Sequence, residues 1–300
     1  MTVGTAPAPS ERLSAEGTTL RPGRPEDAEQ AGRICYEAFR ALAAAHNFLP
    51  DFPSAEVAAG LLSGLIAHPG FYSVVAEQHG RIVGTNFLDE RSTIAGVGPV
   101  TVDPEAQDSG LGTLLMLDVI ERAREKGFVG TRLLQAAYHN RSLGLYTKLG
   151  FDVQEAVVTL QGPSVGEQVP GFSVRTASED DLEEMSRVCR VVHGHDRSGE
   201  VGDAIRQGSA SVVVHDGAIV GYTTGIAYFG HSVATSNHGL AALIAAASEF
   251  GGPGFLLPVS NGEVFRWALA RGIRVVQVMT LMTLGLYNEP RGAYLPSILY

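Results

Sequence analysis

The sequence contains only two cysteines, Cys35 and Cys189, among 300 residues. Both lie in segments with helical periodicity and far apart in the chain, so we expect neither a disulfide framework nor a thiolate metal site. Long hydrophobic runs are also missing, because the longest aliphatic stretch, residues 240–247, is too short to cross a bilayer. The sequence therefore predicts a cytoplasmic protein without a membrane partner and without a bound metal.

Basic side chains are scarce: 22 Lys and Arg stand against 32 Asp and Glu, which gives a formal net charge of −10 at pH 7. Nucleic acids and anionic membranes are bound through basic stripes, so we exclude both as partners. The negative charge mildly favours a cationic amine as substrate. A hydrophobic content of 45% and a length of 300 residues predict a globular chain of two domains. Residues 1–17, rich in Ala, Pro, Ser and Thr, are expected to form a flexible tail.

The most informative segment is the glycine-containing turn that leads from a predicted strand end at residues 100–102 into an apolar helical run. The first amides of a helix lack carbonyl partners and lie at the positive end of its dipole, so they bind anions. Gly110 and Gly112 let a phosphate approach this backbone, and Gln107 and Ser109 add neutral donors. No Lys is present, which excludes a P-loop, and Leu115 replaces the third glycine of a dinucleotide fingerprint. A different phosphorylated cofactor is predicted.

Residues 100–115 resemble the Gln/Arg-x-x-Gly-x-Gly/Ala turn of the GNAT acyltransferase superfamily, and residues 140–151 are similar to its later cofactor-binding segment. The resemblance implies that acetyl-coenzyme A is the cofactor, that Asn140 approaches its pantetheine arm, and that the Tyr146 hydroxyl faces the departing sulfur. A core tyrosine is the alternative for Tyr146, and both roles can hold for one residue. The implied cofactor-binding residues are Val100, Thr101, Val102, Gln107, Asp108, Ser109, Gly110, Leu111, Gly112, Thr113, Asn140 and Tyr146.

The order of predicted elements agrees with this resemblance. A short strand from Thr18 precedes two helices, through residues 31–42 and 54–67; strands follow at 72–77, 81–89 and 94–102, then the glycine turn and its helix, and a strand at 131–137. The GNAT fold has this order. We therefore expect the α+β class, with a mixed, mostly antiparallel central sheet flanked by helices.

The remainder of the chain repeats the scheme in weaker form. Residues 172–184 copy the opening, residues 211–225 copy the hairpin, and residues 256–273 copy 134–151, which indicates an internal duplication. The second copy lacks the Gln-x-x-Gly-x-Gly turn. The whole is similar to tandem GNAT proteins in which a degenerate half follows an intact one. We expect two tandem GNAT folds, a catalytic domain at 18–162 and a degenerate one at 170–300, joined by a linker at about 161–170.

The resemblance implies an N-acetyltransferase that moves acetyl from acetyl-coenzyme A to a primary amine of a small molecule by direct attack in a ternary complex. Tyr146 is the expected acid. Candidate bases are Asp89 and Glu90 at a strand end, and His139. The alternative for each is a solvated residue at a strand end or in a loop. Catalysis through an ordered water would need none of them. A non-catalytic acyl-coenzyme A binding or sensing protein, or an interaction scaffold, is the rival class, and self-association is left open. Candidate substrate-binding residues are His46, Asn47, Phe48, Asp51 and His195.

Two further patterns point elsewhere. Residues 230–234 approach the Gly-x-Ser-x-Gly motif of hydrolases, but no acid followed by a histidine comes after Ser232. His193, His195 and Asp196 have ligand-capable spacing, yet a metal site needs at least three converging groups. We expect residues 193–196 to form a solvated loop that borders the acceptor cleft.

Overall fold

The computed structural model describes residues 17–300, so the expected tail lies outside the described residues except for Gly17. The first half of the chain follows the predicted order of elements. Its helices and strands are β1 (Thr18–Pro22), α1 (Ala28–Ala45), α2 (Ala55–Ala67), β2 (Phe71–Gln78), β3 (Arg81–Asp89), β4 (Ala95–Val97), β5 (Thr101–Val102), α3 (Leu111–Glu125), β6 (Gly130–Ala136), α4 (Asn140–Lys148) and β7 (Asp152–Gln161). The strand expected at 94–102 is therefore two short strands, with a break at residues 98–100.

The second half contains the elements that the duplication predicts. They are β8 (Phe172–Thr176), α5 (Leu182–His193), α6 (Ser198–Arg206), β9 (Ser211–His215), β10 (Ala218–Thr223), β11 (Ser232–Ala234), α7 (Asn237–Ala246), β12 (Phe255–Pro258), α8 (Gly262–Leu269), β13 (Arg274–Gly285) and β14 (Ala293–Leu295). Short 3-10 helices at Pro25–Asp27, Pro104–Ala106 and Glu179–Asp181 precede α1, α3 and α5.

The strands form two sheets in which most neighbours are antiparallel. The larger has nine strands in the order β1-β2-β3-β4-β6-β13-β7-β12, with β5 paired to β3, and the smaller has the order β14-β11-β10-β9-β8. Helices cover both faces of the larger sheet. Phe87 packs with residues of α1 and α2, whereas the next residue, Leu88, packs with residues of α3, because successive side chains of a strand point to opposite faces.

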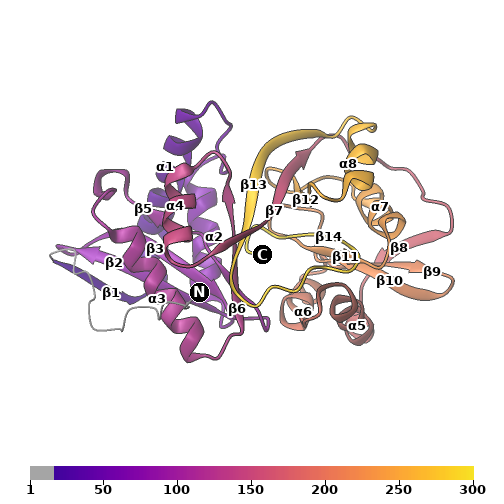
Figure 1. Ribbon diagram of the computed structural model, residues 1–300, viewed down its shortest axis with the longest axis horizontal. Helices are drawn as coiled ribbons and strands as arrows, with labels where there is room; N and C mark the ends of the chain where they lie inside the picture. The colour runs from indigo at the N-terminus through magenta and orange to yellow at the C-terminus, as the bar shows by residue number, and fades with distance from the viewer. Residues whose placement is uncertain (1–16) are drawn as a thin grey trace, which may run out of the picture.

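The larger sheet joins the two halves of the chain. Strand β13 lies between β6 and β7 and is antiparallel to both, so that Leu281 pairs with Leu134 on one side and with Glu155 on the other. Strand β7 in turn lies between β13 and β12. Figure 1 shows β7 and β13 running side by side where the two halves meet. The predicted domain limits at 162 and 170 fall in the connection from β7 to β8, but the hydrogen-bonded sheet crosses that connection.

An ion pair supports the duplication. In the first half Arg21 binds Asp27 through both guanidinium ends, at 2.7 and 2.9 Å, and in the second half Arg175 binds Asp181 at 2.7 Å through each end. Both carboxylates also accept a backbone N–H at the start of the next helix, from Arg24 at 2.7 Å and from Ser178 at 2.8 Å. The arginine lowers the pKa of each carboxyl group. The same contact therefore fixes the first strand to the first helix in both halves.

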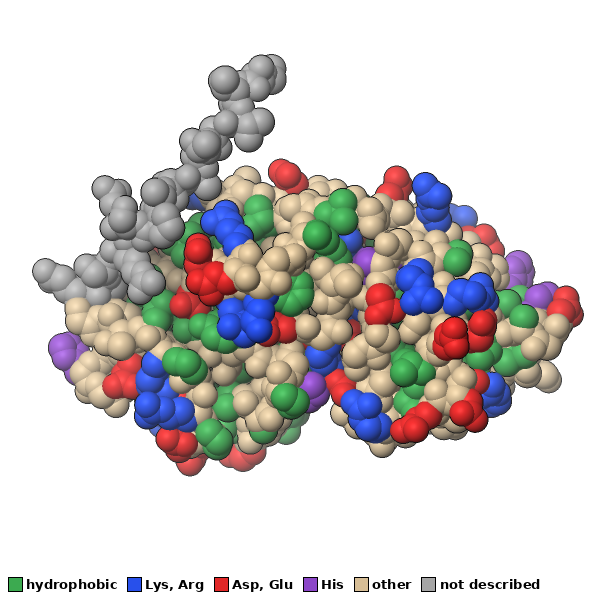
Figure 2. Space-filling model, turned by 90° about the horizontal axis from the view of Figure 1, so that it is seen from below, with side chains coloured by type: hydrophobic (Ala, Val, Ile, Leu, Met, Phe, Trp, Pro, Cys, Tyr) green, Lys and Arg blue, Asp and Glu red, His purple; other side chains and the backbone are tan. Residues whose placement is uncertain are grey.

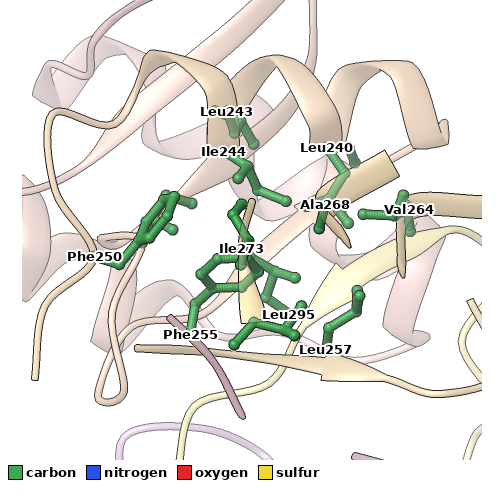
Figure 3. Close-up of a cluster of buried hydrophobic side chains, with 14 of the residues drawn as sticks. Leu240, Leu243, Ile244, Phe250, Phe255, Leu257, Val264, Ala268, Ile273 and Leu295 are labelled. Atoms are coloured by element: carbon green, nitrogen blue, oxygen red, sulfur yellow. The ribbon is translucent and has the colours of Figure 1, made fainter. Parts of the chain in front are cut away.

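Each half has an apolar core, and polar contacts tie the halves together. In Figure 3, Leu240, Leu243 and Ile244 of α7 point toward Phe255 and Leu257 of β12. Between the halves, Asp203 of α6 binds both Arg91, at 3.0 Å, and His68, at 3.1 Å. The buried guanidinium of Arg132 in β6 lies 4.2 Å from the ring centroid of Tyr300, a cation–π arrangement.

The outer surface mixes charges of both signs. On the face in Figure 2, acidic and basic side chains are interspersed and form no stripe of one sign. Within residues 17–300, none of the helices has the length and apolarity that a membrane span requires.

The insertion of β13 predicts that the first half does not fold alone. A fragment of residues 17–165 lacks β13, so β6 and β7 lose their common neighbour and expose unpaired edges and apolar side chains. We expect this fragment to aggregate and to show no cooperative thermal transition by circular dichroism. The control is the full chain cleaved between residues 163 and 170. Its two fragments should stay associated and elute together on size exclusion. A monomeric fragment with a cooperative transition would contradict the prediction.

Candidate functional site

A cavity of about 940 Å³ lies where the glycine turn, the end of β6, α4 and the α1–α2 connection meet. All but one of the predicted cofactor-binding residues line it. The exception is Ser109, whose hydroxyl donates to the carbonyl of Ala106 at 2.6 Å. The second half contributes the side of the cavity formed by Tyr228, Phe229, Met279, Ile298 and Leu299. The cavity is thus built from residues on both sides of the predicted domain boundary.

The start of α3 opens into this cavity without a side-chain cap. Gly110 is the N-cap residue, with φ of +85°, and the first backbone hydrogen bond of the helix is from Leu114 to its carbonyl at 3.1 Å. The amides of residues 111–113 consequently have no intrahelical partner. A Cβ at position 110 would meet no atom within 4 Å. The left-handed backbone, and not crowding, is therefore what favours glycine here.

The sequence predicts that Gln107 and Ser109 donate to a phosphate, but in the structure both side chains form hydrogen bonds within the turn. Gln107 donates from Nε2 to the Val102 carbonyl at 3.3 Å and accepts from Arg141 at 3.2 Å, so it holds the turn. Arg141 of α4 also pairs with Asp108 at 2.7 Å and lines the cavity. Sequence reasoning missed Arg141, although it directly follows Asn140 in the second motif. It places a cation beside the open helix end, where a phosphate would need one.

An opening in the sheet lies next to this turn. Strand β4 pairs with β6 only at Ala95 and Gly96, and beyond them Thr101 and Val102 of β5 pair with β3. The chain therefore separates from β6 where residues 133–136 reach the cavity. Backbone groups that diverge from a neighbouring strand are available to a ligand.

The corresponding helix of the second half is closed. The hydroxyl of Ser236, the N-cap of α7, accepts the N–H of Gly239 at 3.2 Å. The next residue, Asn237, donates to Glu263 at 2.8 Å, which puts a carboxylate near this helix start. A capped amide and an acidic neighbour both disfavour a phosphate.

Tyr146 belongs to the apolar core and also lines the cavity. It is buried, packs in the apolar core with Phe151 at 6.2 Å between ring centroids, and lines the cavity. Burial raises the pKa of Tyr146 to about 12, and a hydrogen bond with Ser142 partly offsets the rise. Ser142 is in turn 2.7 Å from Nδ1 of His139, whose pKa is lowered by burial. Near pH 7 the tyrosine therefore carries its proton and the histidine is neutral.

Asp89 and Glu90, the carboxylates considered as bases, are not part of the cavity lining. Asp89 forms two hydrogen bonds with the Arg91 guanidinium, at 2.9 and 2.6 Å. Glu90 does the same with Arg122, at 2.6 and 3.1 Å. Both carboxylates are therefore occupied by guanidinium groups outside the cavity. These ion pairs connect segments of the fold, because Arg91 also binds Asp203 in the second half and Arg122 belongs to α3.

The expectation for residues 193–196 is wrong. His193 ends α5 and is 2% exposed, and His195 is 7% exposed. The His195 ring stacks on Tyr300 at 6.0 Å and does not line the cavity. Burial lowers the pKa of both histidines. The segment is thus part of the packed contact around Tyr300, which polar residue types in the sequence did not indicate. Ser232 is likewise fully buried and donates to Thr223, consistent with its rejection as a nucleophile.

The candidate acceptor residues divide into two groups. His46 and Asp51 line the cavity, whereas Asn47 and Phe48 do not. Phe48 instead stacks on Tyr138, a lining residue, with 4.3 Å between ring centroids. The partly buried carboxylate of Asp51 accepts from Nε2 of Gln277 in β13 at 3.5 Å. Burial raises the pKa of Asp51 to about 6.

Gln277 links this region to the second half. It accepts from the Tyr138 hydroxyl at 3.3 Å, and its Nε2 donates to the Tyr228 hydroxyl at 3.4 Å. Neither Gln277 nor Tyr228 was identified from the sequence. Gln277 is on β13, and Tyr228 lines the cavity from the connection between β10 and β11.

Comparisons with known proteins agree with this architecture. Residues 36–151 match the family described as Acetyltransferase (GNAT) family, and this segment, less than half of the chain, includes the glycine turn and α4. That part of the chain is thus similar to GNAT acetyltransferases. Mycothiol acetyltransferase of Nocardia farcinica (strain IFM 10152) is 41% identical over 63 residues, an alignment that spans 21% of either chain. The chain thus matches only about a fifth of that relative's length.

Two solved structures resemble nearly the whole chain. A candidate acetyltransferase from Pyrococcus horikoshii superposes with a TM-score of 0.72 at 19% identity, covering 94% of this chain and 96% of that one. A tandem GNAT protein from the clavulanic acid biosynthesis pathway gives a TM-score of 0.55 at 17% identity, covering 89% and 98%. At these identities the likeness shows the fold alone. The expected fold class, two tandem GNAT folds with mostly antiparallel sheets flanked by helices, is confirmed.

The environment of Asp51 predicts a pH-dependent stability. An exposed aspartate titrates near 3.9, so the folded chain holds the Asp51 proton more tightly, and stability falls as the pH rises from about 4 to about 6. Asp51→Asn removes this penalty. We expect the free energy of unfolding in urea to be unchanged near pH 4 and higher by about 1–3 kcal/mol at pH 8, after allowing for solvent screening. Asp152→Asn, at an exposed carboxylate, is the control and should change neither value. A less stable Asp51→Asn protein at pH 8 would refute this account.

Proposed function

We propose that this protein is an N-acetyltransferase that transfers acetyl from acetyl-coenzyme A to a primary amine of a small molecule by direct attack in a ternary complex. The observation that carries the proposal is the uncapped start of α3, which opens into the same cavity as Tyr146. The family match over residues 36–151 supports it, because that segment contains both features.

The residues present suit coenzyme A. Its diphosphate would lie against the amides of residues 111–113, with Arg141 as a cation beside them. The amides of the pantetheine arm would pair with the backbone at residues 100–102, where the strand has left β6. Asn140, at the start of α4, faces the same cavity. These groups would direct the thioester toward Tyr146 and the acceptor end.

The reaction requires three proton movements. The ammonium group of the acceptor first loses a proton, for which the neutral His139 ring in the cavity is the available base. The nitrogen then bonds to the acyl carbon as the carbon–sulfur bond breaks, and the sulfur receives the Tyr146 proton. The second proton of the nitrogen restores the Tyr146 hydroxyl. The products are an amide, a free thiol and one proton released through His139 to solvent.

Thiol release from acetyl-coenzyme A in the presence of a panel of small amines tests the activity. We expect amine-dependent release and expect Tyr146→Phe to lower kcat by about 100-fold or more, because the sulfur then leaves without a proton donor. Coenzyme A affinity, measured by calorimetry, should be unchanged in this variant. Full turnover of Tyr146→Phe across pH would remove the assigned acid. Binding of coenzyme A without release by any amine would favour the acyl-coenzyme A binding or sensing function.

The cofactor site has a matched pair of glycine variants. Gly110 and Gly80 both have positive φ, +85° and +74°, and a Cβ added at either position would meet no atom within 4 Å. Replacement of either by alanine should cost about 1 kcal/mol of stability. Only Gly110→Ala should weaken coenzyme A binding, by about tenfold, because only that backbone presents the α3 amides. Equal affinities of the two variants in calorimetry would disprove the assigned phosphate site.

A further inference from the structure

The acceptor end of the cavity combines one carboxylate with a set of aromatic rings. Asp51 lies there, and the rings come from both halves of the chain. The aromatic lining residues at this end are Phe39, His46, Phe52, Tyr138, Tyr228 and Phe229.

The other charged lining residues belong to the cofactor end. Among the described residues that line the cavity, the arginines and lysines are Arg141 and Lys148, and both are on α4. The second acidic residue, Asp108, is in the glycine turn and is paired with Arg141. Among residues 17–300, the acceptor end therefore has a negative group and no arginine or lysine that could bind an anion.

In the part of the chain that the structure describes, Asp51 forms no ion pair with an arginine or lysine. Within residues 17–300 its hydrogen bond is the one that Oδ1 accepts from Gln277, a neutral and long contact of 3.5 Å. A carboxylate partly removed from water and without a cation is unfavourable for the fold. The Asp89 and Glu90 carboxylates, by contrast, are each held by a guanidinium. A cation bound in the cavity would give the Asp51 carboxylate a charged partner.

We propose that the acceptor end takes a primary ammonium on an apolar or aromatic body without an anionic group, with Asp51 as the counter-ion of the ammonium. This inference rests on the proposed transferase function and names its substrate class. The ammonium gains the ion pair and the faces of the surrounding rings. A carboxylate or phosphate on the acceptor would lie among aromatic rings and Asp51 without a cation to bind it.

The pH dependence follows from the groups that face Asp51, which are Cys35, His46, Tyr138, Tyr228 and Gln277. Burial raises the pKa of the Cys35 thiol and of both tyrosines, so these groups are neutral between pH 5 and 8. With the pKa of Asp51 at about 6, the counter-ion is present above this pH and is lost below it. The KM for the amine should therefore rise as the pH falls below about 6.

A pair of acceptors that differ in one carboxylate tests the substrate class. Thiol release is measured with 2-phenylethylamine and with phenylalanine, which adds only the α-carboxylate. We expect kcat/KM to be about 100-fold higher for 2-phenylethylamine. Equal or better use of phenylalanine would overturn the inference and leave the transferase function intact. Coenzyme A binding without release by either acceptor or by the wider amine panel would instead mean that the transferase proposal itself had failed.

Substitution of Asp51 tests the assigned counter-ion. Asp51→Asn should raise the KM for 2-phenylethylamine by about 100-fold, abolish its rise below pH 6, and leave coenzyme A affinity unchanged. The thermal midpoint at pH 8 should be higher, whereas a merely structural aspartate would lower it when replaced. Asp152→Asn is the control and should keep the parent values. An unchanged KM and pH profile in Asp51→Asn would contradict the assignment.

Discussion

The pairing of β13 with both β6 and β7 is the constraint on which the remaining structure depends. It places a strand of the second half between two strands of the first half, and β12 of the second half pairs with β7 at the sheet's edge. The same strand carries Met279 to the cavity and Gln277 to Asp51, while β6 carries residues 133–136 to the cavity. The cavity therefore has lining residues from both halves of the chain.

The two halves share a fold but differ at one helix start. In α3 a glycine with positive φ leaves the first amides free, and Arg141 lies nearby. In α7 a serine caps the helix, and the carboxylate of Glu263 lies near the helix start because it accepts a hydrogen bond from Asn237. A few side chains thus decide which half offers an anion site, since the backbone of both helices has the same polarity. The second half contributes Tyr228, Phe229, Met279, Ile298 and Leu299 to the lining of the cavity.

The three carboxylates considered near the cleft show why residue type alone does not give a role. Asp89 ends β3 and Glu90 follows it, but Arg91 and Arg122 bind them at 2.6 Å and neither carboxylate lines the cavity. Asp51 lies in a connection without a motif, yet it faces the cavity with a raised pKa. The guanidinium partners come from close in sequence for Asp89 and from α3 for Glu90, and only the folded chain selects them.

The sequence by itself determined the class of fold, the order of the helices and strands, and the internal duplication. It also identified the glycine turn and α4 as segments that line the cavity. These features could be predicted because local periodicity, turn chemistry and helix starts depend on neighbouring residues. The sequence did not determine the insertion of β13, the burial of His193 and His195, the use of Gln107 and Ser109 within the turn, or the meeting of Asp51 with Gln277. Only the tertiary structure decided these, since each depends on contacts between segments far apart in the chain, whose pairing and desolvation leave no local pattern.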